Sequence, residues 1–155
     1  MSSLRMMVAM AALAAVAFCA DNTLGTWKMN AAKSKMPPGQ SPIKSLTVVR
    51  EAVGDAVKMT GKGEREDGTK IDVSYTAKYD GKAVSVTGSG LPYDRISVKQ
   101  VDANTVTDTR MKKGGKYKGT GTFAFSKDGK TATLSAKGTG ADGKPFESVT
   151  AYDKQ

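Results

Sequence analysis

Hydrophobic and polar residues alternate along most of the chain after residue 20. Ile71, Val73 and Tyr75 fall on one side of the segment 70–79, and polar residues fall on the other. The segment 115–125 repeats this alternation. Because successive side chains of a β-strand point to opposite faces, the pattern predicts antiparallel strands with one buried face each. No stretch after residue 20 sustains a helical repeat with caps at both ends.

Short glycine-containing pairs separate these alternating segments. They are Asp67-Gly68, Asp80-Gly81, Gly114-Gly115, Asp128-Gly129 and Asp142-Gly143. Asp-Gly pairs tolerate the positive φ angles of tight hairpins, so we expect a turn at each. A calcium loop would need further oxygen ligands at alternate positions, which these segments lack.

The spacing of strands and turns predicts an all-β fold, an antiparallel up-and-down meander of about eight to ten strands. The expected strands are 24–29, 45–52, 56–64, 70–79, 83–88, 94–101, 105–112, 115–125, 131–138 and 146–153. Closure into a barrel would hide the edges of such a sheet. The exception is Asn30–Ser45, which holds three prolines and is predicted to be a loop or lid.

Residues 1–20 have the layout of a secretory signal peptide. Arg5 precedes an apolar run that ends at Ala20, and this run is too short to span a bilayer comfortably. Lipidation of Cys19 is the alternative, but Phe18 is not the small residue that this modification needs before the cysteine. We therefore predict one barrel domain over 21–155 that is exported, to the periplasm or outside the cell, without stable membrane insertion after leader removal.

The composition excludes several kinds of chemistry. The 155 residues contain no His and one Cys, so triads with an imidazole base, His-ligated metals and internal disulfides are impossible. We predict no enzyme activity, no catalytic residue, no cofactor and no metal. The formal net charge of +9 favours solubility, with attraction to anionic surfaces as the alternative.

The motif Gly25-Thr26-Trp27-Lys28 opens the first expected strand. A Gly-X-Trp at this place in a meander resembles the calycin superfamily of lipocalin-like and fatty-acid-binding β-barrels, including uncharacterised exported bacterial ones. The resemblance implies that Trp27 plugs one end of the barrel and that a basic residue of the last strand, here Lys154, stacks on it. Fatty-acid-binding proteins differ in having a helical lid after the first strand and a carboxylate-binding Arg where this chain has Thr150.

Aromatic residues recur at the positions expected to face inward. The candidate ligand-binding residues are Trp27, Tyr75, Tyr79, Arg110, Tyr117, Phe123 and Tyr152. Other expected inward residues are Phe125, Phe146, Leu46, Val48, Val57, Met59, Ile96 and Val98. Small residues at Gly61, Gly63, Gly88, Gly119, Gly121 and Ala136 either leave room for a cavity or allow the strands to bend.

Arg110 has two interpretations. It is in phase with Val106 and Asp108, which would aim it inward at a carboxylate or at a ligand's acid group. A nearby turn can shift the phase by one residue, and we expect an exposed Arg110. It would then join Lys112, Lys113, Lys116 and Lys118 in a basic, solvated hairpin, which lacks the aromatic platforms of nucleic-acid binders.

The sequence therefore predicts a binding or carrier protein for a small apolar or amphipathic molecule held inside the barrel. The alternative is a non-enzymatic envelope or interaction module with a packed barrel and a basic surface for anionic partners. No specific nucleic acid is expected, and the ligand and oligomeric state stay open.

Overall fold

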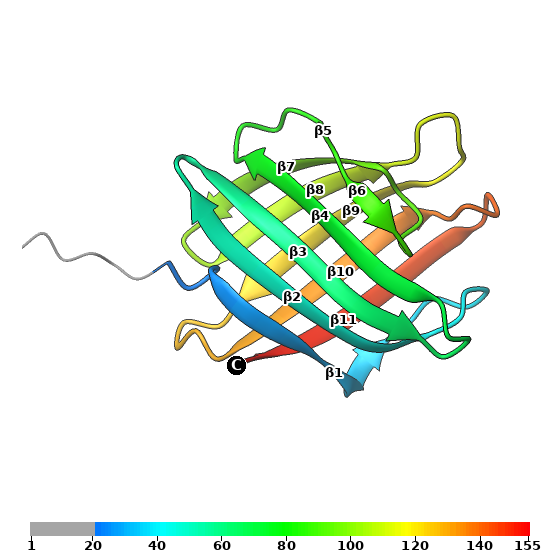
Figure 1. Cartoon of the computed structure of the whole chain (residues 1–155), viewed down its shortest axis with the longest axis horizontal. Helices are drawn as coiled ribbons and strands as arrows, with labels where there is room; N and C mark the ends of the chain where they lie inside the picture. The colour runs from blue at the N-terminus through cyan, green and yellow to red at the C-terminus, as the bar shows by residue number, and fades with distance from the viewer. Residues whose placement is uncertain (1–20) are drawn as a thin grey trace, which may run out of the picture.

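Neighbouring strands pair in antiparallel order around the whole molecule (Figure 1). The computed structural model describes residues 21–155, so the predicted leader with Arg5, Phe18 and Cys19 lies outside the described residues. The eleven strands are β1 (Gly25–Lys35), β2 (Ile43–Val53), β3 (Ala56–Arg65), β4 (Lys70–Lys78), β5 (Val84–Ser85), β6 (Thr87–Ser89), β7 (Arg95–Asp102), β8 (Thr105–Met111), β9 (Lys118–Phe125), β10 (Thr131–Thr139) and β11 (Pro145–Lys154). The all-β prediction is confirmed. None of the described elements is a helix that could cross a membrane.

The first and last strands pair with each other and turn the meander into a nearly closed barrel. Trp27 lies opposite Lys154, and Met29 lies opposite Tyr152, in the β1–β11 ladder. The sheet order is β5-β7-β8-β9-β10-β11-β1-β2-β3-β4-β6, which leaves β5 and β6 as its two edges. The predicted up-and-down barrel is therefore confirmed.

A single extended segment, residues 84–89, forms both of these edges and so bridges β7 and β4. Its first half, β5, pairs with β7, and its second half, β6, pairs with β4. Between them, the buried Val86 donates its backbone N–H to the carbonyl of Asp94 at 2.8 Å. The prediction of one continuous strand over 83–88 is corrected. Gly88, expected to face inward, is exposed and takes a φ of 102°, which brings its backbone against Asp72.

The prediction of a loop over Asn30–Ser45 is wrong at both of its ends, because residues 30–35 belong to β1 and residues 43–45 belong to β2. β1 continues to Lys35, with a shift of register against β11 between Asn30 and Lys35. Ser34 holds this irregular stretch, because its Oγ donates to the Asn30 carbonyl at 2.7 Å and accepts from the Ala151 N–H at 3.0 Å. Only residues 36–42, which contain all three prolines, form the loop.

The expected hairpin turns are confirmed at four of the five glycine-containing pairs. The fifth, Asp80-Gly81, lies between β4 and β5, which do not pair with each other. Gly68, Gly81, Gly114, Gly129 and Gly143 have φ angles of 85°, 73°, 71°, 69° and 80°. Glycine adopts this left-handed conformation without the steric cost of a Cβ atom. The turn at Gly114 is longer than expected, so that β9 begins at Lys118 rather than at residue 115.

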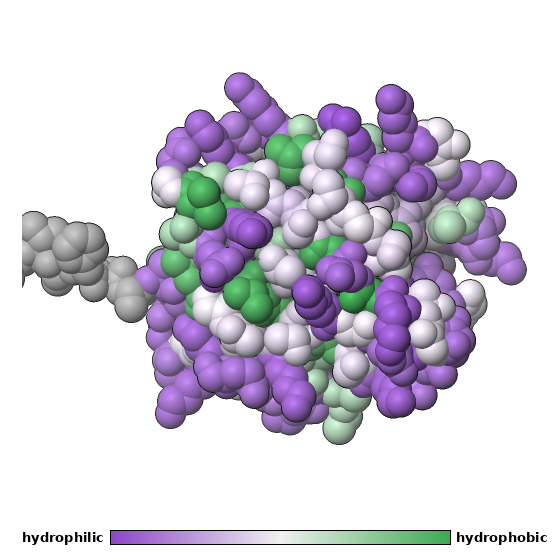
Figure 2. Space-filling view, viewed as in Figure 1, coloured by the Kyte–Doolittle hydropathy of each residue, from purple (hydrophilic) through white to green (hydrophobic). Residues whose placement is uncertain are grey.

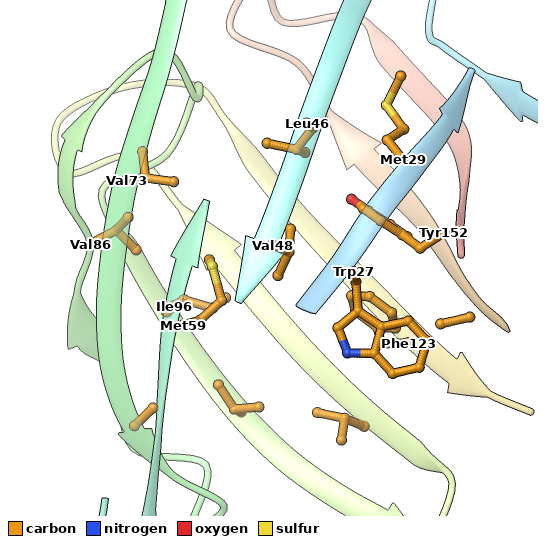
Figure 3. Packing of buried hydrophobic residues seen from close by; sticks show 14 of the residues in the cluster. Trp27, Met29, Leu46, Val48, Met59, Val73, Val86, Ile96, Phe123 and Tyr152 are labelled. Atoms are coloured by element: carbon orange, nitrogen blue, oxygen red, sulfur yellow. The ribbon is translucent and has the colours of Figure 1, made fainter. Parts of the chain in front are cut away.

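The hydrophobic core fills the barrel around Trp27, which is fully buried. Figure 3 shows Trp27 beside Phe123, with Leu46, Val48 and Met59 reaching the same interior from other strands. Trp27 meets the ring of Phe125 edge-on, with centroids 5.1 Å apart. The predicted inward positions Val57, Ile96 and Val98 are also buried. The core is therefore rich in aromatic rings at the end of the barrel where the chain enters.

Candidate functional site

The barrel encloses a cavity of about 140 Å³. Five of the predicted ligand-binding residues line it: Tyr75, Arg110, Tyr117, Phe123 and Tyr152. Trp27 and Tyr79 are not among the lining residues. For scale, an apolar cavity of roughly 150 Å³ holds a benzene molecule. The volume therefore suits a ligand about the size of one aromatic ring.

Trp27 closes one end of the barrel. The ammonium group of Lys154 lies 5.2 Å from the centre of the indole, as the calycin resemblance implied. Gly25 makes this contact possible, because a Cβ atom there would lie 2.7 Å from Lys154 Cε. Gly25 also has a φ of 117°, which disfavours any other residue. These contacts explain the Gly-X-Trp spacing and favour the end plug over the floor of the cavity.

Arg110 points into the barrel, so the expectation of an exposed Arg110 is wrong. Its Nε donates to Asp108 Oδ1 at 2.6 Å and its Nη2 donates to Asp108 Oδ2 at 2.9 Å. The two side chains are only 10% and 8% exposed. Burial by itself lowers the pKa of Arg110, but Tyr93 and Asp108 outweigh it and raise that pKa well above its usual value. The cavity wall thus contains a fixed, charged and doubly hydrogen-bonded pair.

A glycine of β9 leaves the space that this ion pair occupies. Gly121 lies opposite Asp108 and Gly119 lies opposite Arg110 in the β8–β9 ladder. A Cβ atom at Gly121 would lie 2.7 Å from Arg110 Nη2 and 2.8 Å from Asp108 Oδ2. At Gly121 the small residue therefore leaves room inside the barrel, and side chains of the protein itself occupy that room.

Tyrosine rings form much of the remaining wall. Tyr75 and Tyr152 line the cavity, and so does Tyr93, which the sequence reading missed because it lies in the loop before β7. Burial raises the pKa of Tyr75 to about 12 and also raises the pKa values of Tyr93, Tyr117 and Tyr152. Their hydroxyl groups therefore stay protonated at neutral pH and offer hydrogen-bond donors to a ligand.

A second buried arginine was not singled out from the sequence. Arg50 follows Leu46 and Val48 at the same period of two, so the alternation of β2 already placed it inside. It is 4% exposed and lines the cavity. Its Nε donates to the Thr23 carbonyl at 2.8 Å and its Nη2 donates to the Tyr79 hydroxyl at 3.0 Å. Tyr79 therefore reaches the site through Arg50.

Two loops border the cavity at the end away from Trp27. They are residues 36–42 and 90–94, which contribute Met36, Pro37, Leu91 and Pro92 to its lining. Arg65 ties the loops together, because its Nη1 donates to the Ser41 carbonyl at 2.7 Å and its Nη2 donates to the Gly90 carbonyl at 3.1 Å. A ligand that enters by this route has to pass beside the Arg65 contacts.

The predicted basic hairpin keeps its lysines on the surface but loses Arg110 to the interior. Lys112, Lys113, Lys116 and Lys118 are exposed, and Lys112 pairs with Asp94 at 3.1 Å. Figure 2 shows hydrophilic side chains around the outline of one face and hydrophobic ones in small separate patches. In residues 21–155, no group of three or more acidic or Cys side chains could hold a metal ion.

The barrel closure, the plug formed by Trp27 and its stacked Lys154 together define the architecture. The fold is calycin-like. It differs from fatty-acid-binding proteins at Thr150, which lines the cavity at the position where the resemblance implies a carboxylate-binding Arg. The interior cations of this chain come from β2 and β8 instead.

Comparison with solved structures finds matches of low sequence identity. Lobster apocrustacyanin A1 aligns with a TM-score of 0.49 and 11% identity over 88% of this chain, which spans 63% of the crustacyanin chain. A redesigned β-barrel, mFAP1 bound to DFHBI, aligns with a TM-score of 0.43 and 15% identity over 86% of this chain and 95% of that one. The structure of EF1p2_mFAP2b bound to DFHBI aligns with a TM-score of 0.46 and 11% identity over 86% of this chain and 94% of that one. No family model and no curated protein matches the sequence. Similarity of fold at this level carries no information about the ligand.

Proposed function

We propose that this protein binds a small amphipathic molecule inside its barrel and acts as an exported carrier or binding protein. The observation that supports this function is the interior cavity of about 140 Å³, which has aromatic walls and converging polar groups. A binding pocket of this kind has a mostly apolar lining and a few polar side chains that orient the ligand. A barrel used only as a rigid module would gain stability from filling this volume with side chains.

The cavity sets limits on the ligand. Its volume is below the roughly 300–1,000 Å³ of sites for drug-sized molecules, so the closed barrel suits a ring-sized ligand. Phe123 and Tyr152, whose ring centres are 5.4 Å apart, provide an apolar surface for such a ring. The Arg110–Asp108 pair and the hydroxyl of Tyr75 provide polar contacts for its other end. A longer ligand would require the loops 36–42 and 90–94 to separate.

Export is part of this proposal. It is supported by the charged and apolar layout of residues 1–20, which is typical of a cleaved leader. N-terminal sequencing of protein made in a bacterial host and recovered from the periplasm tests it. Recovery of the uncleaved chain from the cytoplasm alone would contradict export and leave the binding function standing.

Binding is tested by thermal unfolding with a panel of ring-sized and longer lipophiles, scored by the increase in melting temperature. Ala136 lines the cavity and is 7% exposed, so Ala136→Leu should fill part of it and abolish the increase. Ala124 is exposed on the adjacent strand, and Ala124→Leu is the matched control that should respond like the unaltered protein. An equal response of both variants would place binding outside the cavity.

A second candidate function is association with anionic surfaces, which the net charge of +9 and the exposed lysines of the basic hairpin favour. Such binding would be electrostatic and would weaken steeply with salt. Retention on an anionic polymer up to physiological salt, together with no response to the lipophile panel, would favour this function over a carrier.

A further inference from the structure

Arg50 is a buried cation that has no carboxylate partner within residues 21–155. The residue is 4% exposed, and its hydrogen-bond acceptors are the Thr23 carbonyl and the Tyr79 hydroxyl, both neutral. No ion pair within 4 Å involves it among the described side chains. A guanidinium group has five N–H donors, so three of those on Arg50 are not used by these two contacts.

The other interior arginine is different in this respect. Arg110 is matched by Asp108 through two hydrogen bonds, which neutralise both charges. Arg65, at the mouth of the cavity, is partly exposed and reaches solvent. Arg50 is therefore the one buried arginine of the described cavity wall that lacks a carboxylate partner.

The surroundings of Arg50 fix its position without neutralising its charge. Its guanidinium carbon lies 5.8 Å from the centre of the Phe123 ring and 5.5 Å from that of the Phe125 ring. The negative faces of aromatic rings attract a cation but supply no countercharge. Burial of a charge is costly unless it is paired and hydrogen-bonded. An anion that reached the free N–H groups would meet a guanidinium already held in one orientation, and charge-assisted hydrogen bonds of this kind are strong.

The cavity beside Arg50 defines what kind of anion fits. Its volume of about 140 Å³ suits one aromatic ring with a small substituent, and Arg50, Phe123 and Tyr75 all line it. The Tyr75 hydroxyl is a protonated donor on the same wall. Arg50 pairs with Gly25, two residues before the Trp27 plug, so it lies toward the closed end of the barrel.

We propose that the ligand is a small aromatic monoanion, such as an aromatic carboxylate, whose acidic group binds Arg50. The acid lies toward the Trp27 end and the ring lies between Phe123 and the tyrosines. This inference rests on the proposed carrier function and specifies the chemical class of its ligand. The acidic group of the ligand has for Arg50 the role that the carboxylate of Asp108 has for Arg110.

The test compares benzoate with benzyl alcohol, which has a similar shape and no charge, by isothermal titration calorimetry at neutral pH. In the unaltered protein, benzoate should bind at least tenfold more tightly than benzyl alcohol. Arg50→Met should reduce this ratio to about one or below. Arg95→Met is the matched control and should keep the ratio, because Arg95 is half-buried on the strand position next to the inward Ile96 and does not line the cavity.

The outcomes separate the two proposals. Equal affinity for the two probes in the unaltered protein, or an unchanged ratio in Arg50→Met, would overturn the role of Arg50. Binding of neutral lipophiles without any binding of benzoate would overturn the anion and leave the carrier function standing. Failure of every probe and of the lipophile panel would reject both.

A second measurement covers the case in which Arg50→Met does not fold. Nuclear magnetic resonance of the unaltered protein labelled with nitrogen-15 arginine observes the Nε–H of each buried arginine. Benzoate should shift the Arg50 signal at lower concentration than benzyl alcohol does and should leave the Arg95 signal in place. An Arg50 signal that does not move while benzoate binds would overturn the assignment.

Discussion

Removal of one partner of the Arg110–Asp108 pair should destabilise the barrel far more than removal of both. In Asp108→Leu, the guanidinium of Arg110 stays buried at 10% exposure but loses hydrogen bonds of 2.6 and 2.9 Å. Breaking a buried pair in this way costs about 3–5 kcal/mol. For a domain of this size, that corresponds to a fall in melting temperature of roughly 10–20 °C. The reciprocal variant Arg110→Met leaves Asp108 unpaired and should lose a similar amount.

The double variant Asp108→Leu/Arg110→Met removes both charges and fills the space with apolar atoms. Such replacements are often neutral or stabilising, so its free energy of unfolding should lie within about 1 kcal/mol of the unaltered value. Urea unfolding followed by the fluorescence of Trp27, the sole tryptophan, measures all four proteins. Single variants that lose less than about 1 kcal/mol, or a double variant that loses the sum of both, would refute the argument that charge pairing dominates at this site.

Two further predictions concern the tyrosines and the end plug. Since burial raises the pKa of Tyr75 from 10.0 to about 12, the folded protein keeps a proton that the unfolded chain loses above pH 10. The free energy of unfolding should therefore fall as pH rises from 10 to 12, by at most about 1.4 kcal/mol per pH unit for this residue, and Tyr75→Phe should flatten the urea-measured profile. Gly25→Ala should cost about 1–3 kcal/mol by thermal unfolding because of its φ of 117°. Lys154→Met, which removes only the contact with Trp27, should cost at most about 1 kcal/mol. An equal loss of stability in Gly25→Ala and Lys154→Met would contradict backbone strain as the cause of the Gly25→Ala loss.

Most of the fold was predictable because strand alternation and turn chemistry are local. Four glycine-containing hairpin turns follow from local turn chemistry, and the inward positions of β2, β3, β7 and β9 follow from a period of two. The errors arose where pairing overrode local composition. Residues 30–35 lack an alternating apolar face and precede a proline-rich loop, yet they remain a strand because Ser34 bridges an irregular register with β11.

The candidate site was predictable only in part. Tyr75, Tyr117, Phe123 and Tyr152 line the cavity as their phase indicated, and Arg50 was equally visible from its phase with Val48. Tyr93 was not visible, because a loop has no periodicity that tells inside from outside. Whether these residues bind a ligand stays a prediction.

The sequence by itself determined the all-β class and the hairpin turns, because each depends on residues close together in the chain. The tertiary structure alone decided that β8 turns Arg110 and Asp108 into the barrel, that Gly121 makes room for this pair and that Arg50 has no carboxylate partner within residues 21–155. The physical reason is that these contacts depend on which face of each strand points inward and on the distances between strands. Those distances are set only when β1 and β11 pair and close the barrel.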